Sequence, residues 1–477
     1  GSVMSAIEYI VGLSGLVASA LFIYGLKDMS SPTTAVRGIV AAGWGMVCVV
    51  AVCFLEIFNV PEEARPYLPV NIVLAVLALL LGGLWAGRKG RTVEMTAMPQ
   101  MVALFNAMGG GAAAAVAAVA FLKHESSAPL PLGVTALGGL IGCMSFSGSI
   151  IAWAKLDGRM NKPLRFGGQQ AFNAFVFAGT LLLAGLTVCS QLDPAPVSGP
   201  YATLFFIGAL AFGICMTVPI GGADMPVVIS LYNAFTGLAV GLDGYVMSNP
   251  ALMVAGMIVG SAGTLLTVLM AKAMNRSLSY VLFSNFGATS EQAKGPEGEM
   301  KSVGPDDAAT SMRYASSVII IPGYGLAVAQ AQQKLYEFVK QLQAAGVDVK
   351  FAIHPVAGRM PGHMNVLLAE AGVPYDMIYD MEDINDSFAS TDVALIIGAN
   401  DVVNPSARTD KTSPIYGMPI LNADQARQVF VIKRGQGTGY SGVQNPLFFL
   451  KNTAMVYGDA QAVLSKMVET LKGLGSN

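Results

Sequence analysis

Long apolar stretches with almost no charged residues fill the first 275 positions of this chain. A helix that crosses a bilayer needs about 20 apolar residues in succession. The sequence predicts nine such spans, at residues 6–26, 38–58, 69–87, 99–122, 132–154, 170–190, 200–219, 225–248 and 251–273. Only 12% of the chain is charged, whereas soluble domains average about 25%. After Gln292 the composition becomes that of an ordinary soluble domain, so we expect a membrane protein made of two parts.

Positively charged residues between the predicted spans favour one orientation. With the N-terminus outside, the inner loops would hold Lys27, Arg37, Arg88, Lys89, Arg91, Lys155, Arg159, Lys162, Arg165, Lys272 and Arg276, and the outer loops Arg65 and Lys123. Membrane proteins keep Lys and Arg preferentially on the cytoplasmic side, and an odd number of spans then places the C-terminal part in the cytoplasm. The net charge of −2 and the lack of any basic run argue against a nucleic-acid partner.

The placement of histidines and cysteines argues against a metal or haem site. His124, His354 and His363 are the three histidines, and all lie outside the predicted spans. Paired intramembrane haem ligands are therefore missing from the sequence, and a haem-type transmembrane reductase is not expected. The five cysteines lie in apolar runs without paired metal-type spacing, so we expect them to be buried apolar side chains.

Polar side chains inside membrane spans are costly and therefore informative. Asp224 lies at a span boundary, in Gly221-Gly-Ala-Asp-Met-Pro226, beside a helix-breaking proline. Other such residues are Asn106, Ser145, Ser147, Ser149, Tyr232, Asn233 and Thr236, and Gly256, Gly260 and Gly263 recur at close-packing spacing. Contacts between helices would also explain each of them. Together they predict a narrow polar path, with Asp224 as the best candidate for a titrating group, and they do not identify what moves along it.

A segment without hydrophobic periodicity separates the two parts. Residues 285–307 are rich in Gly, Ser, Pro, Glu and Lys, which is typical of a flexible tether. We therefore divide the chain into a transmembrane domain at 1–275, a linker at 276–311 and a C-terminal domain at 312–477. The last segment is long enough to form one domain with its own core.

A dinucleotide-type turn opens the C-terminal domain. Residues 318–321 form a short β-branched run, which is typical of a buried parallel strand. Pro322-Gly-Tyr-Gly-Leu-Ala-Val328 follows and leads into a segment of helical composition. Glycines at a strand-to-helix turn let the backbone approach a pyrophosphate at the helix N-terminus. The short glycine pattern is weak by itself, but in this context it favours a dinucleotide site.

The second predicted strand, at residues 346–353, ends without an acidic residue. A site for NAD usually carries Asp or Glu there to bind the ribose hydroxyl. Its absence is compatible with a 2′-phosphate, which a carboxylate would repel. The turn His354-Pro-Val-Ala-Gly-Arg359 comes next. Arg359 is a candidate phosphate ligand, and an ordinary surface arginine is the alternative.

The third predicted strand, at residues 393–397, runs directly into a polar segment that contains Asn400 and Asp401. Open α/β sheets bind their ligands at the carboxyl ends of the strands. Asn400 and Asp401 are therefore candidate site residues.

A fourth strand, at residues 428–432, runs into the loop Lys433-Arg-Gly-Gln-Gly-Thr-Gly-Tyr-Ser-Gly442. Lys433 and Arg434 could bind a 2′-phosphate, and the glycines would let the loop fold over the ligand. A flexible basic surface loop is the alternative. The alternation of strands and helices predicts a Rossmann-like α/β domain with a doubly wound parallel sheet. The fold class is thus an α-helical transmembrane bundle followed by this domain.

Five longer motifs carry a family resemblance. They are Gly221-Gly-Ala-Asp-Met-Pro-Val-Val, Pro322-Gly-Tyr-Gly-Leu-Ala-Val-Ala-Gln, His354-Pro-Val-Ala-Gly-Arg, Pro361-Gly-His-Met-Asn-Val-Leu-Leu-Ala-Glu and Gly442-Val-Gln-Asn-Pro-Leu-Phe. In this combination and order the chain resembles the beta subunit of the proton-translocating NAD(P) transhydrogenases. The resemblance covers essentially the whole chain.

The resemblance implies a function that the residues alone do not show. It implies that the C-terminal domain binds NADP(H), that hydride passes directly between NADH and NADP⁺, and that inward proton movement drives the transfer. It further implies an alpha subunit that carries the NAD(H)-binding domain and additional transmembrane helices. The complete assembly would be a dimer of alpha–beta units in the lipid of the inner (cytoplasmic) membrane.

The resemblance also assigns roles to positions by motif. The cofactor-binding set would be Gly323, Tyr324, Gly325, Val328, His354, Ala357, Gly358, Arg359, Asn400, Asp401, Lys433, Arg434, Gly439 and Tyr440. Lys433 and Arg434 would bind the 2′-phosphate, and Asp401 would lie near the nicotinamide. The proton path would involve Asp224, Asn233, Ser149 and the position of Asn106. Some family members carry a histidine where this chain has Asn106, so the proton-handling group here would lie elsewhere, for example on an alpha-subunit helix.

A function of a different class is the alternative. An ion transporter or channel that is regulated by an NADP(H)-sensing domain would have the same two parts. Such a protein would bind the nucleotide without transferring hydride, so a hydride-transfer measurement separates the two.

Overall fold

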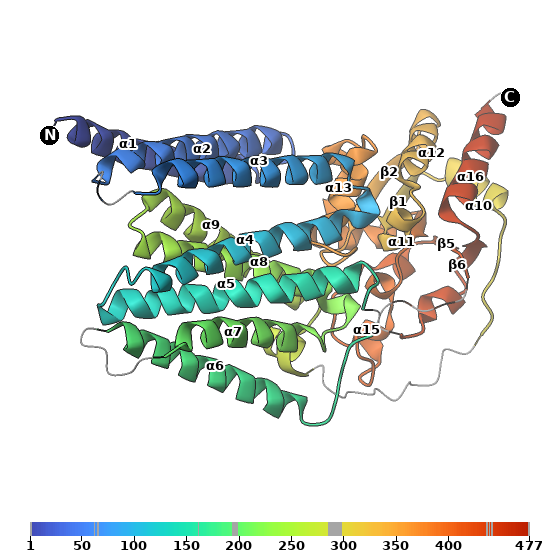
Figure 1. Cartoon of the computed structure of the whole chain (residues 1–477). Coiled ribbons are helices and arrows are strands. Elements are labelled where there is room, and N and C mark those ends of the chain that lie inside the picture. The colour runs from blue at the N-terminus through green and yellow to red at the C-terminus, as the bar shows by residue number, and fades with distance from the viewer. Residues whose placement is uncertain are drawn as a thin grey trace. The chain divides into compact units, whose positions relative to one another are not determined.

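The computed structural model describes residues 2–61, 63, 66–160, 162–192, 199–284, 298–435, 437, 439 and 442–475. These fall into two compact units. The first unit comprises Gly1–Ala154, Gly168–Val218 and Leu231–Leu265, and the second Lys155–Gly167, Pro219–Ser230 and Leu266–Asn477. Figure 1 shows that the N-terminal part of the chain is helical and that all strands lie in the C-terminal part.

The helical part contains a succession of long apolar helices (Figure 1). They are α1 (Ser2–Asp28), α2 (Ala35–Leu55), α3 (Leu68–Thr92), α4 (Met98–Leu122), α5 (Pro129–Leu156), α6 (Gln169–Gln191), α7 (Tyr201–Thr217), α8 (Met225–Val246) and α9 (Pro250–Ala273). Within the described residues, eight helices are long and apolar enough to cross a membrane, and α7 is shorter at 17 residues. The prediction of a membrane protein with a helical N-terminal part is confirmed.

Prolines and glycines set several helix boundaries. Pro69, Pro99, Pro226 and Pro250 stand in the first turn of α3, α4, α8 and α9, where a proline has no hydrogen bond to lose and its fixed φ favours the helix. The sequence predicted a span as far as residue 219, but α7 ends at Thr217. Val218 still has helical backbone, with φ −54° and ψ −39°, and Pro219 then ends the hydrogen-bond pattern because it has no N–H to donate.

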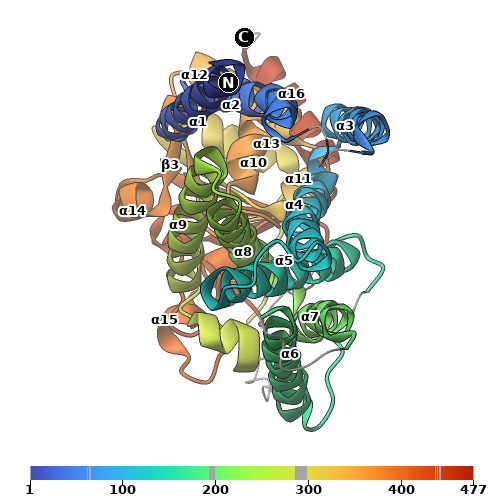
Figure 2. The ribbon, with the colours of Figure 1, turned by 60° about the vertical axis from the view of Figure 1, so that its left-hand side comes forward.

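Within the first unit, α5 and α8 are the most deeply buried of the apolar helices, whereas α3 has no buried residue. Figure 2 shows α1 beside α2 and α6 beside α7. Glycines permit the closest approaches: a Cβ atom on Gly38 of α2 would stand 2.5 Å from the carbonyl oxygen of Gly25 on α1. Small residues at such crossings let helix backbones pack against each other in a membrane.

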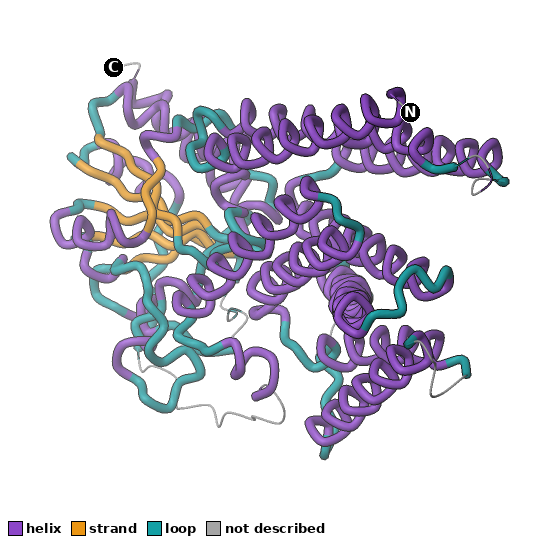
Figure 3. The backbone as a smooth tube through the Cα atoms, turned by 90° about the vertical axis from the view of Figure 1, so that its left-hand side faces the viewer, coloured by secondary structure: helices purple, strands orange, loops and turns teal. Residues whose placement is uncertain are grey.

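The C-terminal part is built on one six-stranded sheet, which Figure 3 shows as a single group of strands. Its strands are β1 (Ser317–Pro322), β2 (Asp348–Ile353), β3 (Ile378–Asp380), β4 (Val393–Ile397), β5 (Gln428–Lys433) and β6 (Thr453–Tyr457). The order is β3-β2-β1-β4-β5-β6, and all pairs are parallel. This is the strand order of a Rossmann fold, so the predicted fold class is confirmed.

Helices precede, separate and follow the strands along the chain. They are α10 (Pro305–Arg313) before β1; α11 (Tyr324–Val328), α12 (Gln332–Ala344), α13 (His363–Glu370), α14 (Met381–Ile384) and α15 (Ser406–Thr409) between strands; and α16 (Ala460–Gly475) after β6. The sequence predicted one helix after Leu326; the structure instead has the short α11, a break in which Gln330 adopts a φ of 51°, and then α12. Helix α10 begins inside the predicted linker, and residues 285–297 lie outside the described part of the chain.

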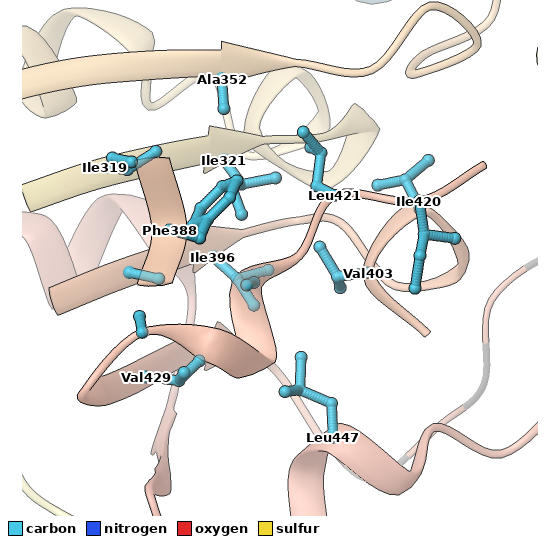
Figure 4. Close-up of a cluster of buried hydrophobic side chains, with 14 of the residues drawn as sticks. Ile319, Ile321, Ala352, Phe388, Ile396, Val403, Ile420, Leu421, Val429 and Leu447 are labelled. Atoms are coloured by element: carbon cyan, nitrogen blue, oxygen red, sulfur yellow. The ribbon is translucent and has the colours of Figure 1, made fainter. Parts of the chain in front are cut away.

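The central strands are rich in Val and Ile because both faces of the sheet are covered. Figure 4 shows Ile319 and Ile321 of β1 with Ile396 of β4 and Val429 of β5, packed with Phe388. These side chains are at most 2% exposed. Burial of each such side chain contributes about 1.5–3 kcal/mol, so this core holds the ends of β1 and β4 in fixed positions.

Candidate functional site

The turn after β1 packs tightly against the turn after β4. Gly323 N donates to Ile397 O at 2.8 Å, and Gly325 N donates to Gly398 O at 3.1 Å. A Cβ atom on Gly323 would stand 2.3 Å from Gly398 O, and one on Gly325 would stand 2.7 Å from Gly398 Cα. Gly398 itself has a φ of 70°, which favours glycine. The three glycines are therefore required by the approach of two backbone turns, whatever ligand they also serve.

A cavity of about 410 Å³ opens beside these turns. Its lining includes nine residues that the sequence predicted for the site: Gly323, Tyr324, Gly325, Ala357, Gly358, Arg359, Asn400, Asp401 and Gly439. The cavity lies at the carboxyl ends of β1 and β4, the adjacent strands at which the sheet order reverses. Open α/β sheets bind ligands at this switch point.

Arg359 brings a positive charge to the cavity from the loop after β2. Its guanidinium carbon lies 4.1 Å from the centre of the Tyr324 ring, a contact of the cation–π type. Burial lowers the pKa of Arg359, although an arginine stays charged at neutral pH. The loop is anchored because the backbone N–H of Arg359 donates to His363 Nδ1 at 3.0 Å. Gly358 has a φ of 93°, and a Cβ atom on it would stand 2.6 Å from that of His363.

Asn400 and Asp401 follow β4 and also line the cavity. Asn445 Nδ2 donates to Asn400 O at 3.0 Å and to Asn400 Oδ1 at 3.2 Å, which fixes the turn. A Cβ atom on Gly439 would stand 2.8 Å from Asp401 Oδ1, so the loop after β5 reaches this carboxylate. Burial lowers the pKa of Lys433, at the end of β5, and the negative charge of Asp401 acts against that shift.

A second group of predicted residues meets among the helices of the first unit. Asn106 Nδ2 on α4 donates to Ser149 Oγ at 2.9 Å and to Ser145 Oγ at 3.4 Å, both on α5. Ser145 Oγ donates to Tyr232 O at 3.0 Å and lies 2.5 Å from Thr236 Oγ1, both on α8. A hydrogen-bond chain therefore links α4, α5 and α8.

Comparison with known proteins decides the family. The sequence profile of the NAD(P) transhydrogenase beta subunit matches residues 11–470. Two curated relatives, the NAD(P) transhydrogenase subunit beta of Rhodospirillum rubrum and that of a named strain of the same species, are each 43% identical over 469 residues. The match covers 96% of this chain and 98% of each relative. The chain belongs to the NAD(P) transhydrogenase beta subunit family.

Four of the described residues that were predicted to bind the cofactor of this transhydrogenase subunit lie outside the cavity lining: Val328, His354, Lys433 and Arg434. Val328, at the end of α11, is 46% exposed. Arg434 pairs with Asp459 on the surface at 3.0 Å, and it lowers the pKa of that carboxyl. Lys433 Nζ lies 4.7 Å from the centre of the Phe448 ring and donates to Gly437 O. Tyr440 lies outside the described residues.

His354 is a buried structural residue in this transhydrogenase subunit. It is 1% exposed, Nε2 lies 2.7 Å from Pro419 O, and Nδ1 accepts from Val356 N at 3.2 Å. These contacts fit a neutral ring with its proton on Nε2. Burial lowers the pKa of His354 to about 4, so the ring stays neutral near pH 7. It holds the start of the loop that carries Arg359.

Two predicted proton-path residues of the transhydrogenase subunit lie apart from the α4–α5–α8 hydrogen-bond chain. Asn233 is exposed on α8, on a different face from the buried Tyr232. Asp224 lies before α8 and pairs with Arg276, with Nη1 to Oδ1 at 2.6 Å. The structure thus joins Asn106 and Ser149, and it places Asp224 in an ion pair.

Sequence patterns did not indicate that Asn445 and His363 position the site. Both stand in motifs that carried the family resemblance. Asn445 precedes a proline, and its Oδ1 accepts from Leu447 N at 3.0 Å, a local turn that the Asn-Pro pair suggests. Its contact with Asn400, 45 residues away, and the support of Arg359 by His363 have no local signature.

Proposed function

We propose that this chain is the beta subunit of a proton-translocating NAD(P) transhydrogenase. In this proposal, hydride passes from NADH to NADP⁺, and inward proton movement across the membrane drives the transfer. The observation that supports it best is the cavity at the β1–β4 switch point, which carries Arg359 and lies in a chain with at least eight apolar helices. Family membership adds the transhydrogenase activity to that geometry.

The cavity suits a dinucleotide that carries a 2′-phosphate. Its volume falls within the range of about 300–1,000 Å³ that is usual for ligand sites. Gly323 and Gly325 line the cavity at the switch point without side chains, at the place where a pyrophosphate binds in Rossmann folds. Strand β2 ends at Ile353 and is followed by the neutral His354, so the end of β2 itself carries no acidic residue for a ribose hydroxyl. These features favour NADP(H) over NAD(H).

Each part of the cavity has a role in this proposal. Arg359 holds a phosphate through its guanidinium, which lies on the Tyr324 ring, while His363 anchors the backbone of Arg359. Asn400 and Asp401 face the nicotinamide end, and the loop through Gly439 covers it. Lys433 and Arg434 bind the 2′-phosphate, and Arg434 does so by giving up its ion pair with Asp459. NADP⁺ supplies the hydride acceptor when it is bound, and the chain orients it and excludes water.

The membrane part supplies the driving force. The two nicotinamide couples are nearly isoenergetic, so hydride transfer alone has little preferred direction. One charge that crosses a membrane at 100 mV releases about 2.3 kcal/mol, which shifts an equilibrium about fiftyfold. The hydrogen-bond chain from Asn106 and Ser149 to Thr236 is the candidate inner part of the proton path.

The assembly follows from the same proposal. Residues 1–275 form the transmembrane domain with the N-terminus outside, 276–311 the linker, and 312–477 the NADP(H)-binding domain in the cytoplasm. An alpha subunit supplies NAD(H) and further helices, and two alpha–beta units form a dimer in the inner membrane. The word "beta" in the family name supports a partner chain.

Reconstitution with an alpha subunit in proteoliposomes tests the function. We expect NADH to reduce an NADP⁺ analogue, and an imposed inward proton gradient to raise the forward rate. A protonophore should remove the increase. If the gradient has no effect, proton coupling is wrong; if no hydride passes, the chain is a nucleotide-regulated transporter or channel instead.

A further inference from the structure

Helix α8 carries one acidic residue, Asp243, on its last turn. Asp243 is 4% exposed. Within the described part of the chain, no hydrogen-bond donor contacts its carboxylate. Oδ1 rests against α5 at Gly138, where a Cβ atom would stand only 2.9 Å away. The Asp243 side chain therefore fits against α5 because Gly138 has no side chain of its own.

Asp243 lines a cavity of about 280 Å³. Apart from Glu125 and Thr135, the rest of the lining is apolar and comes mostly from α4. The hydroxyl of Thr135 donates to Pro131 O at 2.8 Å, so its proton is already used within α5. An ionised carboxylate in such a lining is costly unless water or a proton compensates it.

Glu125 is the only other titratable residue in this lining, and it is exposed. The helices around Asp243 are α4, α5, α8 and α9. Their other titratable side chains are Cys143, Lys155, Tyr232, Tyr245 and Lys272, and none of these lines the cavity. Asp243 is therefore the one buried group in this pocket that can change its charge, with Glu125 at the exposed side.

The cavity is built by the same three helices as the α4–α5–α8 hydrogen-bond chain. That chain ends on α8 at Thr236, seven positions before Asp243, which is about 10 Å along a helix. Its own members are an amide and hydroxyl groups, which do not take up a proton near neutral pH. The carboxyl group of Asp243, on one of the same helices, can bind a proton, which the groups of the hydrogen-bond chain cannot.

We propose that Asp243 is a proton-binding site of the membrane part, reached through the cavity beside Glu125. The carboxylate takes a proton from water in the cavity, becomes a neutral acid, and later releases the proton toward the α4–α5–α8 chain. This proposal rests on the proposed function, and in the predicted orientation the Glu125 side is the outer one. Asp243 is then the uptake group for inward proton movement.

Labelling with dicyclohexylcarbodiimide tests the site independently of activity. The reagent adds as a whole to a protonated carboxyl in an apolar pocket and leaves a stable acylurea. In the membrane-embedded full chain, we expect mass spectrometry to find the adduct on Asp243, with slower labelling as the pH rises. The Asp224→Asn variant should be labelled at the same rate. No adduct on Asp243 at any pH, or a rate that does not change with pH beyond that of the reagent itself, would overturn the proposal.

Turnover separates this inference from the proposed function. In proteoliposomes with an alpha subunit, Asp243→Asn should lower gradient-driven turnover by about a hundredfold, the low end of what a positioned proton-transfer group contributes. NADP(H) affinity should not change, and Asp243→Glu should keep most of the gradient response. A normal response in Asp243→Asn refutes the Asp243 site alone. If the wild-type protein ignores the gradient, the proposed function fails, and the labelling result still decides whether Asp243 binds a proton.

Discussion

A Cβ atom on residue 439 would stand 2.8 Å from Oδ1 and 2.9 Å from Oδ2 of Asp401. The loop after β5 therefore approaches the carboxylate more closely than any side chain would allow. Asp401 follows β4, and Gly439 follows β5, so this contact closes one side of the cavity with two segments that are 38 positions apart in the sequence. The loop and the candidate nicotinamide end of the site are thus coupled directly.

Gly439→Ala should weaken NADP(H) binding by about tenfold, or about 1.4 kcal/mol. The added methyl group cannot share the space of the Asp401 carboxylate, so the loop or the acid must move. Isothermal titration of the solubilised protein with NADPH measures this change. Gly437→Ala is the matched control, because a Cβ atom there would meet nothing within 4 Å. Equal affinities of the two variants would contradict the prediction.

Arg359→Ala should weaken NADP(H) binding by about 1.5–3 kcal/mol, the value of a hydrogen bond to a charged group. Its guanidinium lines the cavity, held 4.1 Å from the Tyr324 ring centre. Tyr324→Phe keeps the ring and should lose much less affinity. Titration with NADPH gives both values, and thermal unfolding checks that the fold is retained. The role of Arg359 as a phosphate ligand would be wrong if its removal left the affinity unchanged.

His354 should make the C-terminal domain less stable as the pH falls. Burial lowers the pKa of His354 from 6.5 to about 4 in the folded chain. Between these values the unfolded chain binds the extra proton, so stability is complete above pH 6.5 and is lost toward pH 4. The loss approaches about 3 kcal/mol, at about 1.4 kcal/mol per pH unit.

Hydrogen exchange of the full chain, corrected for the intrinsic effect of pH, measures this loss in the peptides that contain β2 and Pro419. In His354→Asn the difference between pH 7 and pH 5 should become smaller. A wild-type protein whose β2 is equally protected at both pH values would rule out the neutral buried histidine.

Gly256→Ala should destabilise the α8–α9 pair by about 1–3 kcal/mol, the usual cost of overpacking. A Cβ atom on Gly256 would stand 2.2 Å from Gly241 N on α8, which is backbone and cannot rotate away. Gly260→Ala is the control on the same helix, because its nearest atom would be 3.5 Å away. Thermal unfolding in detergent should separate the variants, and a lower melting temperature for Gly260→Ala than for Gly256→Ala would show that the helices pack differently.

The sequence predicted those features that depend on local patterns. The β1 turn is marked by β-branched residues and then glycines, and the long helices are marked by their apolar length. Strands β3 and β6 were not predicted: β3 is three residues long, and both lie at sheet edges. β3 is too short to show a period, and β6 is a short run, with four of its five residues buried, that periodicity alone does not distinguish from a buried helix segment.

The candidate sites were less predictable because their geometry is long-range. Ser145 and Ser149 are four residues apart and share a helix face, as their spacing indicates. Tyr232 and Asn233 are neighbours in the sequence, and adjacent helical residues point about 100° apart. The Tyr232 side chain is accordingly buried and that of Asn233 exposed, and the backbone carbonyl of Tyr232 accepts from Ser145. The partner of Asp224, Arg276, is 52 positions away, so no local pattern could indicate it.

Removal of Arg276 should destabilise the protein more than neutralisation of Asp224. The Asp224 side chain is buried and that of Arg276 is partly buried, 5% and 18% exposed, and removal of one member of a buried ion pair costs about 3–5 kcal/mol. Arg276 is the more exposed member, and its long side chain can reach water once Asp224 becomes Asn. Asp224 cannot do so, although its place before α8 gives it partial compensation from the helix N-terminus.

Melting temperatures of Arg276→Met, Asp224→Asn and the double variant therefore form an informative cycle. We expect the order of destabilisation to be Arg276→Met above Asp224→Asn, with the double variant losing less than the sum of the two. The losses are sub-additive because the first substitution removes one charge of the ion pair, and the second removes the buried charge that had lost this partner. Additive losses would mean that the two charges do not stabilise each other, and the ion pair would then have no part in holding the start of α8.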